Sequence, residues 1–175
     1  RIARQIVRRR DEERFSTTLD LAEVIEKAVG GRKGKRTHPA TRSFQAIRLF
    51  INDELGELVQ ALGAAERILR PGGRLVVVTF HSLEDRIVKL FLRERSGQSG
   101  GGSRHAPERP AGAPPSFDLV ARRPIEPGDD ELEENVRARS ARLRWAIRTE
   151  VQAWGELAVK DSGLPTLEDL RRLMA

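Results

Sequence analysis

The stretch Pro71-Gly72-Gly73-Arg74-Leu75-Val76-Val77-Val78-Thr79-Phe80 decides the fold that this sequence predicts. Its proline and two glycines end a helix. The uninterrupted apolar run that follows indicates a strand buried on both faces of a parallel sheet. The next residues, Ser82-Leu83-Glu84-Asp85, have a capping-box pattern and begin a helix that is expected to reach Arg95. Helix, turn, buried strand and helix in this order are the unit of an α/β doubly wound fold.

Apolar residues recur at helical spacing upstream of this strand. The steps of three and four from Phe44 to Leu69, preceded by Pro39 in the expected first turn, predict one long helix with a single buried stripe. Residues 2–10 and 21–29 predict two shorter amphipathic helices. Thr17 is placed to cap the second one, and Gly30-Gly31 is expected to end it. The N-terminal end of the chain is therefore expected to be a small helical unit followed by a basic loop.

The chain downstream of the strand and its helix changes character. Residues 96–116 are rich in Gly, Ser, Pro and Ala and predict a flexible surface loop. Residues 117–122 and 142–148 predict two further strands, separated by an acidic turn over residues 126–134. Residues 151–175 have a weak helical pattern in which Thr166 could cap a helix.

The composition excludes several classes of protein and of site. The 175 residues are 38% apolar, which is enough for a modest core and argues against disorder throughout the chain. The absence of cysteine excludes disulfides, thiolate zinc sites and cysteine nucleophiles. The three histidines are far apart in sequence, so no metal site is expected. Neither a membrane-spanning run nor a signal peptide is apparent, and we expect a cytoplasmic protein.

The positive charge of the chain is concentrated at its N-terminal end. The net charge is +6, and residues 1–37 contribute 11 basic and 6 acidic side chains. The basic residues cluster at Arg8–Arg10 and again at Arg32–Arg36. Such clusters attract phosphate backbones, but a solvated surface in an arginine-rich protein has the same pattern, and charge alone does not separate the two interpretations.

Several polar side chains follow the predicted strand directly. His81, Ser82, Glu84 and Asp85 lie at its carboxyl end, where open α/β sheets bind their ligands. The purely structural interpretation is that Ser82 and Asp85 cap a helix and that His81 is a histidine with satisfied hydrogen bonds. A serine hydrolase that uses His81 and Ser82 is excluded, because the side chains of adjacent residues point apart and the chain has no G-x-S-x-G motif.

Parts of the chain resemble known methyltransferases. Residues 65–78 resemble the helix, "L-x-P-G-G-R-L" turn and strand of enzymes that bind S-adenosylmethionine on a Rossmann-like sheet. Four further blocks resemble, in order, the ribosomal RNA small-subunit methyltransferase H (MraW) family. They are His38-Pro39-Ala40-Thr41-Arg42-Ser43-Phe44-Gln45-Ala46-Ile47-Arg48, Asn52-Asp53-Glu54-Leu55, Phe80-His81-Ser82-Leu83-Glu84-Asp85-Arg86 and Asn135-Val136-Arg137-Ala138-Arg139-Ser140-Ala141-Arg142-Leu143-Arg144. The resemblance extends from residue 1 to about residue 150.

The resemblance implies a domain organisation. In this family a Rossmann-like methyltransferase domain is interrupted by a helical insertion. Residues 1–37 would be the end of that insertion, and residues 38–150 the second, C-terminal half of the sheet domain. Residues 151–175 would be a C-terminal extension, either lineage-specific or produced by a shifted reading frame. The glycine-rich loop that holds S-adenosylmethionine has no counterpart here, so we expect a fragment whose cofactor-binding residues lie upstream of Arg1.

The resemblance also implies the chemistry, which is methylation of the exocyclic N4 amine of a cytidine in 16S ribosomal RNA. The base must be unstacked to reach the pocket, and the amine must be positioned and must lose a proton. The candidates to accept hydrogen bonds from the amine or to orient it are His81, Glu84, Asp85 and Asn52.

The expected partners follow from the same resemblance. The candidate contacts to the backbone of 16S ribosomal RNA, or of the small ribosomal subunit, are Arg42, Arg48, Arg137, Arg139 and Arg142. An RNA-binding module without catalysis is the alternative, and it predicts RNA binding that does not depend on the cofactor. Because half of a doubly wound sheet leaves an open edge and a bare apolar face, we also expect the isolated chain to form a homodimer or to aggregate.

Overall fold

A computed structural model describes residues 1–32, 34, 37–98 and 114–155. The chain divides into two compact units, Arg1–Glu54 and Leu55–Ala175. The predicted loop falls largely on residues 99–113, and the predicted helical pattern with Thr166 falls largely after residue 155. Both of these stretches lie outside the described residues.

The first unit begins with the two predicted helices, α1 (Ile2–Glu12) and α2 (Thr18–Val29), which pack on each other. Thr17 caps α2 as expected, since its side-chain oxygen accepts a hydrogen bond from the backbone N–H of Asp20. The helix ends at Gly30, whose φ of 85° is open to glycine at little cost. The sequence signals for this helix are therefore confirmed at both of its ends.

The long helix predicted after Pro39 is wrong, because the structure has two helices there. Helix α3 covers Thr41–Ile51 and helix α4 covers Glu54–Ile68. Asn52 ends α3, and Asp53 has a φ of 47° in the left-handed region. Asp, like Asn, adopts that conformation more readily than most non-glycine residues, so the break falls at a residue that tolerates it.

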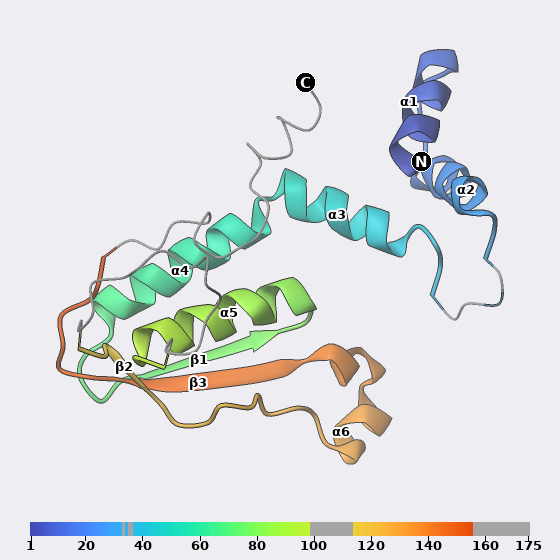
Figure 1. The fold of residues 1–175 in the computed structure, drawn as a ribbon. Helices are drawn as coiled ribbons and strands as arrows, with labels where there is room; N and C mark the ends of the chain where they lie inside the picture. The colour runs from blue at the N-terminus through green and yellow to red at the C-terminus, as the bar shows by residue number, and fades with distance from the viewer. Residues whose placement is uncertain (33, 35–36, 99–113, 156–175) are drawn as a thin grey trace. The chain divides into compact units, whose positions relative to one another are not determined.

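The second unit is built on a three-stranded antiparallel sheet (Figure 1). Its strands are β1 (Arg74–Thr79), β2 (Phe117–Leu119) and β3 (Arg142–Arg148), in the order β1-β3-β2. Strand β3 is antiparallel to both neighbours, so β1 and β2 run in the same direction. The predicted parallel neighbour for β1 is therefore not found among the described residues, where β1 pairs with β3 alone.

Helices α4 and α5 (Ser82–Arg95) cover one face of this sheet, as Figure 1 shows. Phe91 of α5 meets Phe117 of β2 edge-on, with ring centroids 5.9 Å apart. Both rings are fully buried, and burial of apolar side chains of this size is the main stabilising contribution to such a unit. The buried members of this core are Val59, Leu62, Leu75, Ile87, Val88, Phe91, Leu92, Phe117 and Ala146.

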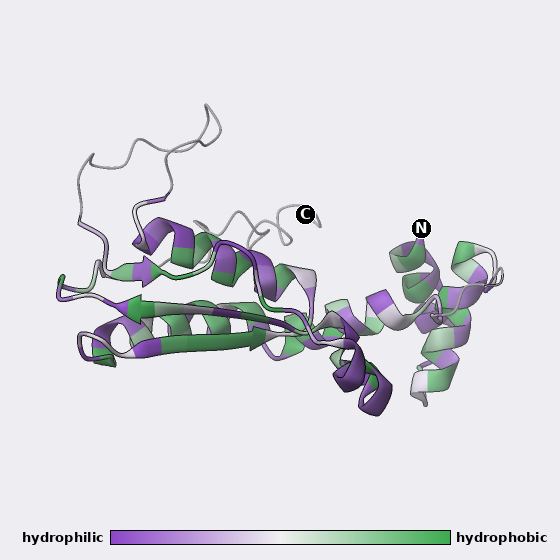
Figure 2. Cartoon of the chain, turned by 90° about the horizontal axis from the view of Figure 1, so that it is seen from below, coloured by the Kyte–Doolittle hydropathy of each residue, from purple (hydrophilic) through white to green (hydrophobic). Residues whose placement is uncertain are grey.

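The other face of the sheet is open among the described residues, which corrects the expectation that β1 is buried on both faces. Val76 and Val78 are 53% and 49% exposed. They lie opposite Trp145 and Leu143 of β3, so these four apolar side chains share a face. Figure 2 views the sheet from below and shows apolar residues along β1. An uncovered apolar face of this kind marks a surface on which something else packs.

The predicted elements after α5 are only partly confirmed. Strand β3 has the predicted bounds, but β2 ends at Leu119 because the chain then leaves the sheet, returning at a single bridge between Ile125 and Leu143. The predicted acidic turn contains a short helix, α6 (Asp129–Glu134), and a 3₁₀ helix, η1 (Val136–Ser140), follows it. Ser116, placed in the surface loop by sequence, is fully buried.

Candidate functional site

The junction between β1 and α5 is fixed by a reciprocal cap. His81 is the N-cap of α5, and its Nδ1 accepts a hydrogen bond from the backbone N–H of Glu84 at 3.3 Å. Glu84 Oε2 accepts in return from the backbone N–H groups of Phe80 and His81, at 2.9 and 3.3 Å. The predicted capping box is therefore present, but its first residue is His81 and not Ser82, which is exposed.

This cap sets the chemistry of the His81 ring. Because Nδ1 accepts a hydrogen bond, it carries no hydrogen, and the neutral ring has its N–H at Nε2. Nε2 lies 3.1 Å from Glu84 Oε1, but it is not aligned with that oxygen for a hydrogen bond. Among the described side chains it is the one buried polar atom without a hydrogen-bond partner. His81 thus offers a donor at Nε2, which suits an orienting role and not the role of an acceptor, the two roles that the sequence suggested for it.

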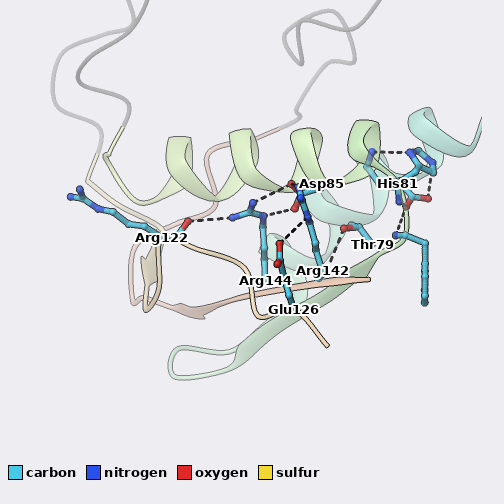
Figure 3. A network of polar contacts seen from close by, with 9 residues as sticks. Thr79, His81, Asp85, Arg122, Glu126, Arg142 and Arg144 are labelled. Atoms are coloured by element: carbon cyan, nitrogen blue, oxygen red, sulfur yellow. Dashed lines mark hydrogen bonds and ion pairs between the residues drawn. The ribbon is translucent and has the colours of Figure 1, made fainter. Parts of the chain in front are cut away.

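Asp85, one turn into α5, is held by two arginines of β3 (Figure 3). Arg144 binds it through two hydrogen bonds, from Nε to Oδ1 at 2.7 Å and from Nη2 to Oδ2 at 3.2 Å. Arg142 Nη1 donates to Oδ2 at 3.1 Å. Asp85 is 6% exposed and Arg144 is 9% exposed, so this is a buried bidentate ion pair with a third, more exposed partner.

The two arginines decide the charge state of Asp85. Burial by itself would raise the pKa of the carboxyl group, but the hydrogen bonds and positive charges of Arg144 and Arg142 outweigh it and hold the pKa below the usual value. Asp85 is therefore ionised at neutral pH, with both oxygens engaged. A carboxylate that is ionised and hydrogen-bonded through both oxygens stabilises the packing of the elements around it, and it is poorly placed to accept a proton.

The network continues from Asp85 to the chain that follows β2. Arg144 Nη1 donates to the backbone carbonyl of Arg122 at 3.3 Å, and Arg142 Nε lies 3.5 Å from Glu126. Arg142, which the sequence placed among the RNA contacts, is thus directed toward two carboxylates. Its side chain is nevertheless 44% exposed, and the network leaves it at the surface of the unit.

The first unit contains three of the sequence candidates. Arg48 Nε lies 2.7 Å from Glu54 Oε1, and the Asn52 side-chain amide donates to the same oxygen at 3.2 Å. Arg42 is exposed in the first turn of α3. The structure therefore brings Arg48 and Asn52 together on one carboxylate.

Two further candidates lie on the 3₁₀ helix η1. Arg137 and Arg139 are both exposed, and the turn that carries them is fixed by Asn135, whose side-chain oxygen accepts from the backbone N–H of Arg137 at 3.1 Å. Among the described residues neither arginine side chain has an ion-pair partner. They remain available to an anionic partner.

A second buried polar cluster, not predicted from the sequence, surrounds Glu66 of α4. Arg95 Nε lies 3.0 Å from Glu66 Oε2, and Ser116 Oγ and the backbone N–H of Trp154 both donate to Oε1. Arg148 Nε donates to the Glu66 carbonyl at 2.8 Å. The one sequence signal was a charged residue within the apolar stripe of this helix. The cluster joins the segment around residue 154 to the core of the unit.

The described residues do not form a complete cradle for S-adenosylmethionine. Such a cradle uses a glycine-rich strand-to-helix turn whose backbone approaches the ligand. The turn after β1 contains no glycine, and its two backbone N–H groups at Phe80 and His81 are occupied by the Glu84 carboxylate. No step through the cofactor follows from these residues. None of the described helices is long and apolar enough to cross a membrane.

The chain matches a known protein family along most of its length. The profile described as the MraW methylase family matches residues 1–149. The chain belongs to this family. A ribosomal RNA small subunit methyltransferase H from Caulobacter vibrioides is 65% identical over 154 residues, which are 88% of this chain and 50% of that protein. One of the same name from Hyphomonas neptunium is 58% identical over 172 residues, 98% of this chain and 50% of that protein.

These relatives confirm the resemblance found in the four sequence blocks. The chain spans about half the length of the curated MraW relatives that it matches. The Hyphomonas match leaves only three of the 175 residues uncovered, so the similarity continues through most of residues 151–175.

Proposed function

We propose that this chain is the C-terminal portion of a methyltransferase that acts on small-subunit ribosomal RNA, with S-adenosylmethionine as the methyl donor. The observation that carries the proposal is the family match over residues 1–149, together with relatives named for this activity. The proposed target is the N4 amine of a cytidine in 16S ribosomal RNA. An enzyme with this substrate works in the bacterial cytoplasm.

The proposed domain organisation follows the order of the elements. Residues 1–37 would belong to a helical insertion and residues 38–150 to the second half of a Rossmann-like domain, with residues 151–175 as an extension. Strands β1 and β2 run in the same direction, and α5 follows β1 on one face, both of which suit such a sheet. The exposed face of β1 and β3 would be covered by residues that this sequence lacks.

The site at the end of β1 suits recognition of a cytosine base. The base presents an acceptor, N3, next to the donor N4 amine. The junction presents a donor and an acceptor side by side, since His81 Nε2 lies 3.1 Å from Glu84 Oε1. His81 would donate to N3 and Glu84 Oε1 would accept from an N–H of the amine, and the two contacts together would orient the base with its amine toward the methyl donor. Asp85 would act through Arg142 and Arg144 as a support for α5.

The second candidate function is an RNA-binding module without catalysis. It is favoured by one observation, namely that the described residues do not form a cofactor cradle. It predicts RNA binding that is independent of S-adenosylmethionine. The two proposals differ in what they predict for a protein of full family length that contains this chain. The first predicts methyl transfer to RNA, and the second predicts RNA binding alone.

The test compares the 175-residue chain with a protein of full family length that contains it. We expect calorimetric titration to show S-adenosylmethionine binding only by the longer protein. We also expect labelled methyl groups to appear in 16S ribosomal RNA, as N4-methylcytidine, only with that protein. Micromolar binding by the chain alone would overturn the proposed placement of the cofactor site. A longer protein that binds RNA and cofactor but transfers no methyl group would favour the non-catalytic alternative.

We expect the chain by itself to form homodimers or larger assemblies through the open face of the sheet. Val76, Val78 and Trp145 are apolar and lie together on that face, and the second edge of β1 is unpaired among the described residues. Sedimentation velocity should show association that Val78→Glu weakens. The matched control, Val136→Glu, changes an exposed valine outside the sheet and should leave association intact. A monodisperse wild-type monomer would contradict this prediction.

A further inference from the structure

A basic hollow lies beside the C-terminal half of α5. It has a volume of about 480 Å³ and is lined by Lys89, Arg93, Gly97, Gln98, Leu119 and Arg122. Three of these side chains are cationic and none is acidic. The hollow is separate from the junction at His81, and it includes none of the arginines that the sequence analysis selected.

The three cations have no ion-pair partner among the described residues, in contrast to Arg95, Arg142 and Arg144. Lys89 and Arg93 are four residues apart and therefore lie one above the other on the same side of α5. Like charges at this spacing repel each other and weaken the helix unless an anion lies between them. Arg122 adds a third positive charge from the segment after β2.

The buried network fixes the position of Arg122. Its backbone carbonyl accepts a hydrogen bond from Arg144, which is itself held by Asp85 of α5. Figure 3 shows the side chain of Arg122 pointing away from this network. Helix α5, which carries Lys89 and Arg93, thus also holds the segment that carries Arg122. The two contacts that connect them are Asp85 to Arg144 and Arg144 to the Arg122 carbonyl. The backbone segments that carry the three cations are therefore connected by buried contacts.

We propose that Lys89, Arg93 and Arg122 bind phosphate groups of an RNA backbone. This proposal rests on the proposed function, because it takes the partner to be an RNA substrate. The lining contains no aromatic side chain on which a base could stack, which favours the backbone over a bound nucleobase. Contacts to phosphates hold a nucleic acid in register without reading its sequence, so this hollow would position the RNA while the junction at His81 acts on the base.

The test is fluorescence anisotropy of a labelled oligouridine with the 175-residue chain, titrated over a range of salt concentrations. The oligomeric state of the chain is first established by sedimentation velocity. The site variant is K89Q/R93Q/R122Q. The matched control, R70Q/R74Q/R123Q, removes the same charge from exposed arginines outside the hollow, one of them adjacent to Arg122. Circular dichroism confirms that each variant is folded.

We expect the site variant to bind more weakly and to lose salt dependence. Each phosphate contact on a single strand contributes about 0.7 to the slope of log K against log salt, so three lost contacts reduce the slope by about 2. The control should change the slope by clearly less. Equal losses in both variants, or no loss in the site variant, would overturn the proposed site alone. Absence of RNA binding by the wild-type chain would likewise overturn the proposed site, whereas absence of RNA binding by a protein of full family length would contradict the proposed action on RNA.

Discussion

Replacing Asp85 with alanine is expected to destabilise the second unit by about 3–5 kcal/mol, the usual cost of removing one partner from a buried ion pair. Arg144 is 9% exposed and would keep its charge without the carboxylate that now accepts two of its hydrogen bonds. The contact from Arg144 to the Arg122 carbonyl would remain, but it cannot compensate a buried positive charge. The measurement is urea unfolding followed by tryptophan fluorescence.

Two controls separate the buried pair from its exposed neighbour. Arg142→Ala removes a side chain that is 44% exposed, and its loss should cost about 1 kcal/mol or less. The double substitution D85L/R144M removes both buried charges and should recover much of the stability, because well-packed apolar pairs replace buried ion pairs at little cost. If Asp85→Ala cost no more than Arg142→Ala, the buried pair would not be a main support of the unit.

The same pair predicts a pH dependence. The pKa of Asp85 is lower in the folded chain than its ordinary value of 3.8, so the unfolded chain takes up the proton first as the pH falls. The stabilisation by Asp85 is therefore fully present above pH 3.8 and is lost as the pH falls through the lowered pKa of the folded state. Urea unfolding of the wild type and of Asp85→Ala should converge over that acidic window and differ by a constant amount between pH 5 and 7, a range well above both values.

Local signals in the sequence were sufficient to predict some of the elements closely. Strand β3 was predicted with its observed bounds, and α2 was predicted with both of its caps. These signals act over a few residues, since a capping side chain or a left-handed glycine satisfies backbone groups within the same turn. Asn52 and Asp53 were missed because they break a helix through backbone conformation, without the proline or glycine that usually indicates a break.

Long-range partners were not predictable from one sequence. Asp85 was selected as a candidate for catalysis, but its partner Arg144 lies 59 residues further along the chain. The alternation of residue types along β3 also does not indicate which of its faces is buried. Apolar residues such as Leu143 and Trp145 lie on the open face. Arg144 and Arg148 lie on the face covered by helices, where Arg144 donates to Asp85 and Arg148 donates to the Glu66 carbonyl. Only the packing of α4 and α5 decides which face of such a strand becomes the interior.

His81→Ala, made in a protein of full family length, is expected to lower the rate of methyl transfer to 16S ribosomal RNA on the order of 100-fold, the lower end of what positioned proton donors and acceptors contribute. The reason is the Nε2–H group, a buried donor that has no hydrogen-bond partner among the described residues and that lies 3.1 Å from Glu84 Oε1. The measurement is transfer of labelled methyl groups under single-turnover conditions, so that product release does not limit the rate.

Because His81 also caps α5, the lower rate of His81→Ala could come from the missing cap or from the missing imidazole ring. A second variant separates these two causes. Asn accepts the cap hydrogen bond well, whereas loss of an N-cap costs about 1 kcal/mol, so His81→Asn should be as stable as the wild type and His81→Ala less stable. If the ring takes part in the reaction, both variants transfer methyl groups slowly despite their different stabilities. If His81→Asn restored the wild-type rate, His81 would serve the helix only, and recognition of the base would have to be assigned to other residues. A change in KM without a change in kcat would assign His81 to binding of the RNA and not to the reacting amine.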